Sequence, residues 1–252
     1  MDINGCVALV TGGNRGIGEG FVRVLLDSGA RKVYAGSRDP AAAAALVTEF
    51  PGRCEAIELD VTDAAEVAAA EAACADVNLL VNNSGAFTNR LLMGSPDMSG
   101  AREEMEVNYF GVLAMCRAFA PVLARNGGGA IVNVLSAAAL VNLPVMGGYP
   151  PSKAAARSLS TAVRAELADQ GTQVIALIVG SVDTRMASHV AGSKETPEDI
   201  ARAGLKAIKH GIDEMDTDAM AIEVRAGLAL DPKGQERRYA RMLKSTSIRT
   251  GK

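Results

Sequence analysis

A tyrosine and a lysine four residues apart, Tyr149 and Lys153, have the types and spacing that suit proton transfer. On a helix, positions i and i+4 lie on the same face, so the phenol and the amine would be neighbours. A free tyrosine titrates near pH ~10, and it needs a nearby cation before it can exchange a proton at neutral pH. The pair therefore predicts general acid–base chemistry, although the same spacing also occurs on ordinary exposed helix faces.

The glycine-rich run Thr-Gly-Gly-Asn-Arg-Gly-Ile-Gly, residues 11–18, directly follows an apolar segment and could bind phosphate groups. Gly12 can make a tight turn, Gly16 can let the backbone approach a pyrophosphate, and Gly18 can let a helix and a strand pack closely. A helix that begins here also offers free N–H groups to an anion. The alternative is a glycine-rich turn with no ligand. The residues of this predicted dinucleotide cradle are Gly12, Asn14, Arg15, Gly16, Ile17 and Gly18.

The residues at the end of the second apolar segment indicate which nicotinamide dinucleotide, NAD(H) or NADP(H), the chain would bind. NAD-binding proteins usually place an acid there against the ribose 2′-hydroxyl, whereas this chain has Ser37 followed by Arg38. Arg15 and Arg38 could together bind a 2′-phosphate, because a planar guanidinium pairs well with phosphate. The sequence therefore predicts NADP(H) rather than NAD(H). In the alternative, both arginines are solvated and Asp39 binds the ribose, which would favour NAD(H).

These residues lie far apart in the chain, so the fold must bring them together. Short apolar segments alternate with longer Ala-rich segments of helical spacing, which is typical of a parallel sheet with helices on both faces. The sequence thus predicts an α/β fold of a single domain over residues 1–252, a Rossmann-type doubly wound parallel sheet. Six buried strands are expected at residues 7–10, 32–35, 56–59, 79–81, 130–135 and 174–179. Helices are expected at residues 18–28, 64–75, 101–124, 152–169 and 197–210, with another ending near Leu230.

Composition and charge narrow the classes of partner. The net charge is −3 and the body of the chain has no long run of Lys or Arg, so we expect a small molecule rather than nucleic acid or a membrane surface. The four cysteines are widely spaced and have no histidine cluster nearby, so neither a disulfide framework nor a metal site is predicted. We find no basic leader and no apolar run of membrane-spanning length, which makes a cytoplasmic location the expectation.

The last segment, residues 235–252, carries six cations against one acid. This composition predicts a solvated, partly frayed basic tail, with docking to a partner or a neighbouring subunit as the alternative.

Several motifs occur in a fixed order, each at a strand end or on a helix: residues 11–18, the Asn82-Asn83-Ser84-Gly85 stretch, Asn108, Ser136 and the Tyr149/Lys153 pair. On these motifs, residues 5–190 resemble a short-chain dehydrogenase/reductase. The resemblance implies that Tyr149 exchanges a proton with a carbonyl or alcohol oxygen that Ser136 orients. It also implies that Lys153 lowers the tyrosine pKa and holds the nicotinamide ribose, and that Asn108 supports a water on a proton path.

The same resemblance implies further contacts to the cofactor, and two departures limit what it implies. Asp60 resembles the family's adenine-contacting acid, but it equally suits a cap or turn residue ahead of Thr62. Val179-Gly180 stands where the family commonly has Pro-Gly, and the family's frequent C-terminal ending is not recognisable, so a homodimer and a homotetramer both remain open. The implied cofactor contacts, besides the cradle and Arg38, are Asp60, Val61, Asn83, Gly85, Tyr149, Lys153, Val182 and Thr184.

Apolar residues between Ala137 and Gly148, together with residues 186–193, would border the substrate and predict a mainly apolar carbonyl compound. His189 could face the substrate or be a lone exposed histidine. We expect an NADPH-dependent oxidoreductase that reduces a ketone or aldehyde to an alcohol. One alternative is an NAD(P)-dependent secondary-alcohol dehydrogenase working in the oxidative direction. The other is a non-catalytic NADP-binding regulatory protein that kept the fold.

Overall fold

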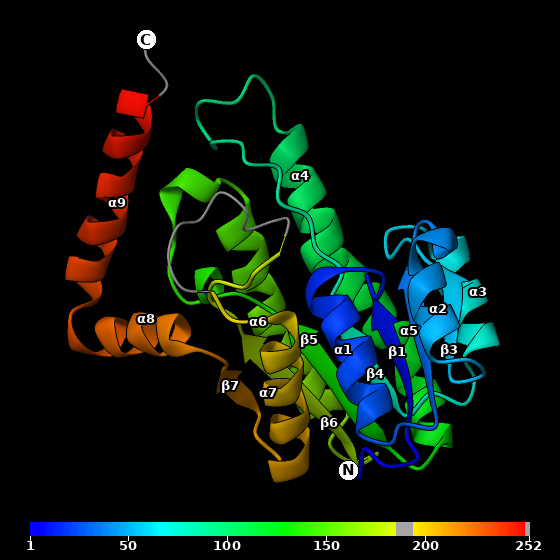
Figure 1. The fold of residues 1–252 in the computed structure, drawn as a ribbon. Helices are drawn as coiled ribbons and strands as arrows, with labels where there is room; N and C mark the ends of the chain where they lie inside the picture. The colour runs from blue at the N-terminus through cyan, green and yellow to red at the C-terminus, as the bar shows by residue number, and fades with distance from the viewer. Residues whose placement is uncertain (185–193, 250–252) are drawn as a thin grey trace.

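A parallel seven-stranded sheet forms the centre of the computed structural model, which describes residues 1–184 and 194–249 (Figure 1). The strand order is β3-β2-β1-β4-β5-β6-β7, so the chain builds outwards from β1 in one direction and from β4 in the other. In such sheets, ligands bind outside the carboxyl ends of the strands at the point where the order reverses. The strands are β1 Val7–Thr11, β2 Lys32–Ser37, β3 Cys54–Glu58, β4 Leu79–Asn82, β5 Gly129–Val134, β6 Thr172–Ile178 and β7 Glu214–Asp216.

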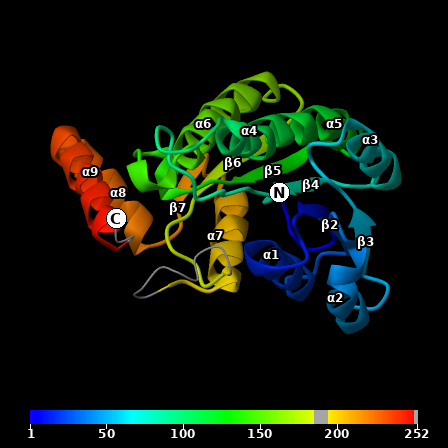
Figure 2. The same ribbon diagram turned by 90° about the horizontal axis from the view of Figure 1, so that it is seen from above.

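Helices cover both faces of the sheet, as Figure 2 shows. Helices α1, α2 and α7 pack on one face around Phe21 and Ile200, whereas α3, α5 and α6 pack on the other around Phe119 and Met115. This confirms the predicted doubly wound α/β fold. The helices are α1 Gly16–Asp27, α2 Ala44–Glu49, α3 Ala64–Ala73, α4 Ser99–Met105, α5 Val112–Arg125, α6 Tyr149–Glu166, α7 Pro197–His210, α8 Ala219–Leu230 and α9 Pro232–Arg249.

The strands at the two edges of the sheet differ from the expectation. All six expected strands are present, but in β3 only Cys54 is buried, because β3 lies at the edge of the sheet with β2 as its strand neighbour. The seventh strand, β7, was missed because it has three residues and carries two acids, Glu214 and Asp216, in place of an apolar run. Its half-buried positions explain why polar side chains are tolerated there.

Helices α4 and α5 are joined by a π-helical turn, Glu106–Gly111, into one helical run from Ser99 to Arg125. By length and composition alone this run is apolar enough to cross a membrane, contrary to the expectation from the sequence. Met115, Phe119 and Leu123 are fully buried between this run and the sheet. Packing in the protein core therefore accounts for the apolar composition of the run.

The described part of the C-terminal segment forms a helix, where the sequence predicted a solvated, partly frayed tail. Helix α9 covers Pro232–Arg249 and stands beside α8 at one end of the sheet (Figure 1). Its Tyr239 is only 9% exposed and belongs to the same buried apolar cluster as Tyr149 and Val224. The basic charge pattern of this segment did not indicate that Tyr239 is buried.

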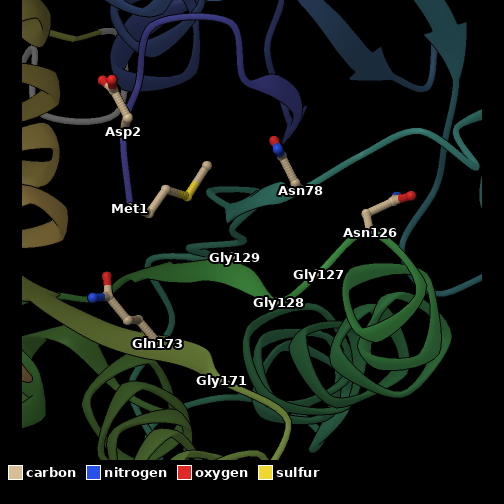
Figure 3. Close-up of a pocket in the computed structure, with 9 residues that line it drawn as sticks. All are labelled: Met1, Asp2, Asn78, Asn126, Gly127, Gly128, Gly129, Gly171 and Gln173. Atoms are coloured by element: carbon tan, nitrogen blue, oxygen red, sulfur yellow. The ribbon is translucent and has the colours of Figure 1, made fainter.

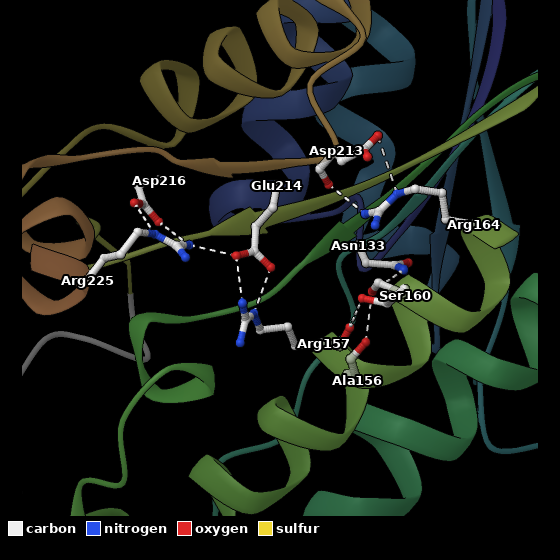
Figure 4. Close-up of polar contacts among 10 residues, drawn as sticks. Asn133, Ala156, Arg157, Ser160, Arg164, Asp213, Glu214, Asp216 and Arg225 are labelled. Atoms are coloured by element: carbon white, nitrogen blue, oxygen red, sulfur yellow. Dashed lines mark hydrogen bonds and ion pairs between the residues drawn. The ribbon is translucent and has the colours of Figure 1, made fainter. Parts of the chain in front are cut away.

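An ion-pair network fixes the position of α8 relative to the helix that carries Tyr149 (Figure 4). Glu214 on β7 accepts hydrogen bonds from Arg157 of α6 at 2.7 and 2.9 Å and from Arg225 of α8 at 2.8 Å. Arg225 also forms two hydrogen bonds with Asp216. Because Arg157 of α6 and Arg225 of α8 both bind the Glu214 carboxylate, β7 connects the sheet to both helices.

Replacing Glu214 with glutamine is expected to lower the free energy of unfolding by about 1 kcal/mol, since the partners are partly exposed. Although burial opposes ionisation, hydrogen bonds from Arg157 and Arg225 lower the pKa of Glu214. The contribution is therefore present above the unfolded-state pKa and is lost as pH falls through the lower folded-state pKa. Denaturant unfolding at neutral and acid pH checks this, and an equal difference between wild type and variant at both would contradict it.

Candidate active site

Tyr149 and Lys153 lie together on the first turns of α6, as the i and i+4 spacing predicted. The Lys153 Nζ is 5.8 Å from the centroid of the Tyr149 ring and donates a hydrogen bond to the Val134 carbonyl oxygen at 3.0 Å. Both side chains are buried, at 8% and 5% exposure. Pro150 follows Tyr149 in the first helical turn, where a missing N–H costs nothing. The sequence therefore starts the helix at the tyrosine.

Asn108 holds the loop after β4 against α6. Its Oδ1 accepts from the Ala86 N–H at 2.9 Å, and its Nδ2 donates to the Ala86 oxygen and to the Ser152 hydroxyl, each at 2.9 Å. The residue is fully buried within the π-helical turn. Such turns are rare and frequently occur at functional sites. Asn108 thus joins the segment that contains Gly85 to the helix that contains Lys153.

Burial dominates the ionisation of the Tyr149/Lys153 pair. It raises the pKa of Tyr149 to about 12, where a hydrogen bond with Ser136 acts in the opposite direction and the charge of Glu104 adds to the rise. Burial also lowers the pKa of Lys153 to about 8. In the cofactor-free chain, burial is therefore the largest influence on the tyrosine pKa, and the role of Lys153 in lowering that pKa stays a prediction. At neutral pH the tyrosine is a phenol, which is the proton-donating form.

Ser136 follows β5 and lies at the same edge of the sheet. Its hydroxyl oxygen accepts from the Ala138 N–H at 3.1 Å, which caps the short turn Ala137–Ala139. The ring of Phe87 meets the Tyr149 ring edge-on with centroids 5.4 Å apart. The four residues predicted to act together therefore converge from β5, the π-helical turn and α6.

The glycine-rich run forms a tight connection between β1 and α1. Gly12 has a φ of +64°, and a Cβ on Gly18 would lie 2.1 Å from the Gly12 oxygen, so only glycine fits there. The Asn83 amide donates to the Thr11 oxygen at 2.9 Å and to the Gly12 oxygen at 3.2 Å. Asn83 therefore ties β4 to the run, and no described side chain caps the start of α1, which leaves its N–H groups available to an anion.

Both arginines of the predicted 2′-phosphate site are exposed. Arg15 is the residue before α1, and Arg38 follows β2. The Asp39 carboxylate instead accepts from the Ala41 N–H at 3.0 Å and caps the next turn. This capping role of Asp39, which was not predicted from the sequence, uses its Oδ1.

Asp60 has the turn role of the two roles that the sequence left open, and its contact with the adenine stays a prediction. Its Oδ1 accepts from the N–H and hydroxyl of Thr62 at 2.9 and 2.7 Å, as a turn residue does. Burial opposes its ionisation, yet these bonds and the positive charge of Arg38 lower its pKa. A charged Asp60 therefore lies near Arg38, on the side of the sheet where an adenosine would bind.

The remaining predicted contacts are placed at the same edge. Val61 is buried against Gly111, and a Cβ on Gly85 would lie 3.3 Å from Asn108 Oδ1. Val182 is buried in the core, and Thr184 lies over Gly16, where an added Cβ would be 3.3 Å from the Thr184 methyl group. Residues 186–193, including His189, lie outside the described residues.

A polar cavity of about 300 Å³ lies elsewhere, at the amino ends of β4, β5 and β6 (Figure 3). Asn78, Asn126 and Gln173 line it together with glycines. None of the predicted site residues lines this cavity, so the candidate active site is at the opposite edge of the sheet.

Comparison with known proteins gives the decisive observation for the family. The model of the short chain dehydrogenase family matches residues 6–195. This chain belongs to the short-chain dehydrogenases.

Relatives of this dehydrogenase act on different compounds. It is 31% identical to the rhamnolipids biosynthesis 3-oxoacyl-[acyl-carrier-protein] reductase of Pseudomonas aeruginosa, over 79% of this chain and 81% of that protein. It is 36% identical to a galactitol 2-dehydrogenase (L-tagatose-forming) of Cereibacter sphaeroides, over 78% of each chain. A short chain dehydrogenase from Burkholderia cenocepacia, solved in complex with NADP, is 43% identical, covers 95% of this chain and 99% of its own, and gives a TM-score of 0.89.

Sequence reasoning missed three residues around the site of this dehydrogenase. Glu104 is fully buried near Tyr149, and Tyr239 reaches the apolar cluster from α9. Asp218 caps α8 and accepts from the Gly180 N–H at 2.6 Å, which anchors the loop after β6 where the family commonly has proline. In the sequence, Glu104 stands four residues before Asn108, and Asp218 stands before a helical segment. Neither position distinguishes a buried acid from a solvated one.

Proposed function

We propose that this dehydrogenase is an NADPH-dependent reductase that converts a mainly apolar ketone or aldehyde to an alcohol. One observation carries the proposal: the Tyr149 phenol and the Lys153 amine are buried together at the carboxyl edge of the sheet, beside an apolar cluster. A buried phenol with a pKa near 12 is suited to give up a proton only when a stronger base, such as a developing alkoxide, is present.

The residues at the nucleotide end fit NADP(H). The tight Gly12–Gly18 connection leaves the start of α1 free for a pyrophosphate, and Arg15 and Arg38 are exposed on the side of β2 where a 2′-phosphate would be expected. Asp39, the residue that would favour NAD(H), is engaged with Ala41. When bound, the cofactor supplies a hydride to the carbonyl carbon.

Each of the four site residues then has a defined part in the reduction. Ser136 donates a hydrogen bond to the substrate oxygen and orients it, while Tyr149 gives that oxygen its phenolic proton. Lys153 stays close to the phenol, and its pKa of about 8 lets it gain or lose a proton near neutral pH. Asn108 keeps Ser152 and the Ala86 segment in place and so holds the pair at the edge of the sheet.

The apolar cluster beside Tyr149 supports an apolar substrate. It contains Phe87, residues of the loop at 137–146, Val224 from α8 and Tyr239 from α9. An apolar wall of this kind favours a hydrocarbon or aromatic group next to the carbonyl and offers little to a sugar. Its buried members are Ala137, Ala138, Val141, Leu143, Tyr149, Val224 and Tyr239.

Steady-state assays with a matched panel of ketones test the proposal. The panel pairs each apolar ketone with a hydroxylated ketone of similar size, with NADPH and NADH offered separately. The proposal expects turnover of the apolar members with NADPH. Turnover of hydroxylated members alone, or tight NADPH binding without any turnover, would contradict it.

Replacing Tyr239 with alanine is expected to raise KM for a bulky apolar ketone by about tenfold, because burial of one aromatic ring contributes free energy of that order. A small ketone that does not reach α9 should be affected much less. Tyr239→Phe is the matched control, since it keeps the ring and should keep the wild-type KM. Equal effects of Tyr239→Ala on large and small ketones would contradict a role in the substrate wall.

A further inference from the structure

Glu104 is a fully buried carboxylate that the proposed reduction does not yet use. Its Oε1 accepts from the Thr88 N–H at 2.8 Å and from the Thr88 hydroxyl at 2.9 Å. Its Oε2 is buried and has no hydrogen-bond partner among residues 1–184 and 194–249. A buried carboxylate oxygen without a partner carries a free-energy cost, so the residue calls for an explanation.

The unpartnered oxygen faces the start of α6. A Cβ on Gly148 would lie 2.6 Å from Glu104 Oε2, so the glycine allows the carboxylate to approach the helix end. Gly148 is the residue before α6, and Tyr149 is the first residue within it. The N-terminus of a helix carries a partial positive charge, which favours an anion at this place. The acid of α4 is thus held next to the turn that contains Tyr149.

Few other groups that can carry charge face Tyr149 in the described part of the chain. Lys153 comes from its own helix and Ser136 from the end of β5, while α9 contributes the phenol of Tyr239 to the same cluster. Phe87, on the segment tied to Glu104 through Thr88, presents an uncharged ring edge. Burial is the largest cause of the raised pKa of Tyr149, the Ser136 hydrogen bond opposes it, and the Glu104 charge adds to it.

We propose that Glu104 is a positioning residue that holds a buried negative charge beside the first turn of α6 and thereby disfavours the phenolate form of Tyr149. This inference rests on the proposed function, to which it adds a preference in direction. In reduction the carbon gains a hydride, the oxygen gains the tyrosine proton, and the phenolate left behind regains a proton from solvent. In oxidation the tyrosine must start as a phenolate, which a nearby negative charge disfavours. Glu104 therefore favours the proton donor needed for reduction over the base needed for oxidation.

Glu104→Gln tests this because glutamine keeps the size of the side chain and the oxygen that accepts from Thr88. Removing the charge should lower the pKa of Tyr149 by about one pH unit. At any pH below the Tyr149 pKa of both the wild type and the variant, the phenolate fraction would then be about tenfold larger in the variant. Ultraviolet absorbance of the cofactor-free protein reports this fraction directly when the same titration in a Tyr149→Phe background is subtracted. The pH profile of alcohol oxidation should move to lower pH by the same amount.

Two further variants separate a charge effect from a structural one. Glu103→Gln removes the same charge from an exposed neighbour on α4 and should leave the titration unchanged. Thr88→Val removes a hydrogen bond to the carboxylate but keeps the charge, and it too should leave the titration unchanged. The inference is wrong if Glu104→Gln titrates like wild type, or if Thr88→Val reproduces the shift. If wild type reduces no ketone, the proposed function fails, yet the absorbance titration still decides the role of Glu104.

Discussion

Replacing Tyr149 with phenylalanine is expected to lower kcat for carbonyl reduction by about 10²- to 10⁴-fold, the contribution of a positioned general acid. Within residues 1–184 and 194–249, the structure places the Tyr149 phenol beside both Ser136 and the apolar cluster. The change removes a single hydroxyl and leaves the ring in its contact with Phe87. Single-turnover measurements with saturating NADPH would report the loss in the chemical step itself.

The matched control is NADPH binding by the same variant. Nicotinamide fluorescence should show binding close to wild type, because the glycine-rich run and both arginines are untouched. Wild-type turnover by Tyr149→Phe would show that another group donates the proton. Loss of binding together with turnover would mean that the variant had disturbed the whole site.

Replacing Arg38 with alanine is expected to weaken NADPH binding by about 10- to 100-fold, since a hydrogen bond to a charged group contributes roughly 1.5–3 kcal/mol. NADH lacks the 2′-phosphate and should bind the variant as it binds wild type. The exposed Arg38 lies near Asp60 and follows β2 at the edge of the sheet where nucleotides bind. Parallel fluorescence titrations with the two cofactors measure the difference.

Arg31→Ala serves as the control for a general loss of positive charge. Arg31 precedes β2 at the opposite end of the strand and pairs with Asp76 at 3.4 Å. The control should bind both cofactors like wild type. An Arg38→Ala protein that loses affinity equally for NADPH and NADH would argue against a 2′-phosphate site at this position.

Much of the fold and the convergence of the site could be predicted from the sequence, because the determining signals are local. Short, mainly apolar runs such as 79–81 and 130–135 are typical of a sheet covered on both faces, and the motif residues follow these runs directly. Strand ends in a parallel sheet meet at one edge. The positions of Ser136, Asn83 and Tyr149 relative to one another follow from that geometry.

The parts that could not be predicted depend on contacts between distant segments. Strand β7 consists of three residues with two acids, and its pairing with β6 is stabilised by Arg157 and Arg225 from two different helices. Tyr239 is buried because α9 returns to the 144–146 turn, which a basic composition does not indicate. The burial of Glu104 likewise depends on Gly148, which is 44 positions further along the chain.

Transfer of deuterium from NADPH labelled at nicotinamide C4 to an apolar ketone tests the central claim most directly. Mass spectrometry of the product would show whether the alcohol carries the label on its carbinol carbon. We expect labelled alcohol from the wild-type protein and at least about a hundredfold less from Tyr149→Phe in the same time. Tight NADPH binding without label transfer to any ketone or aldehyde would contradict the account and would favour a nucleotide-binding protein that does not catalyse reduction.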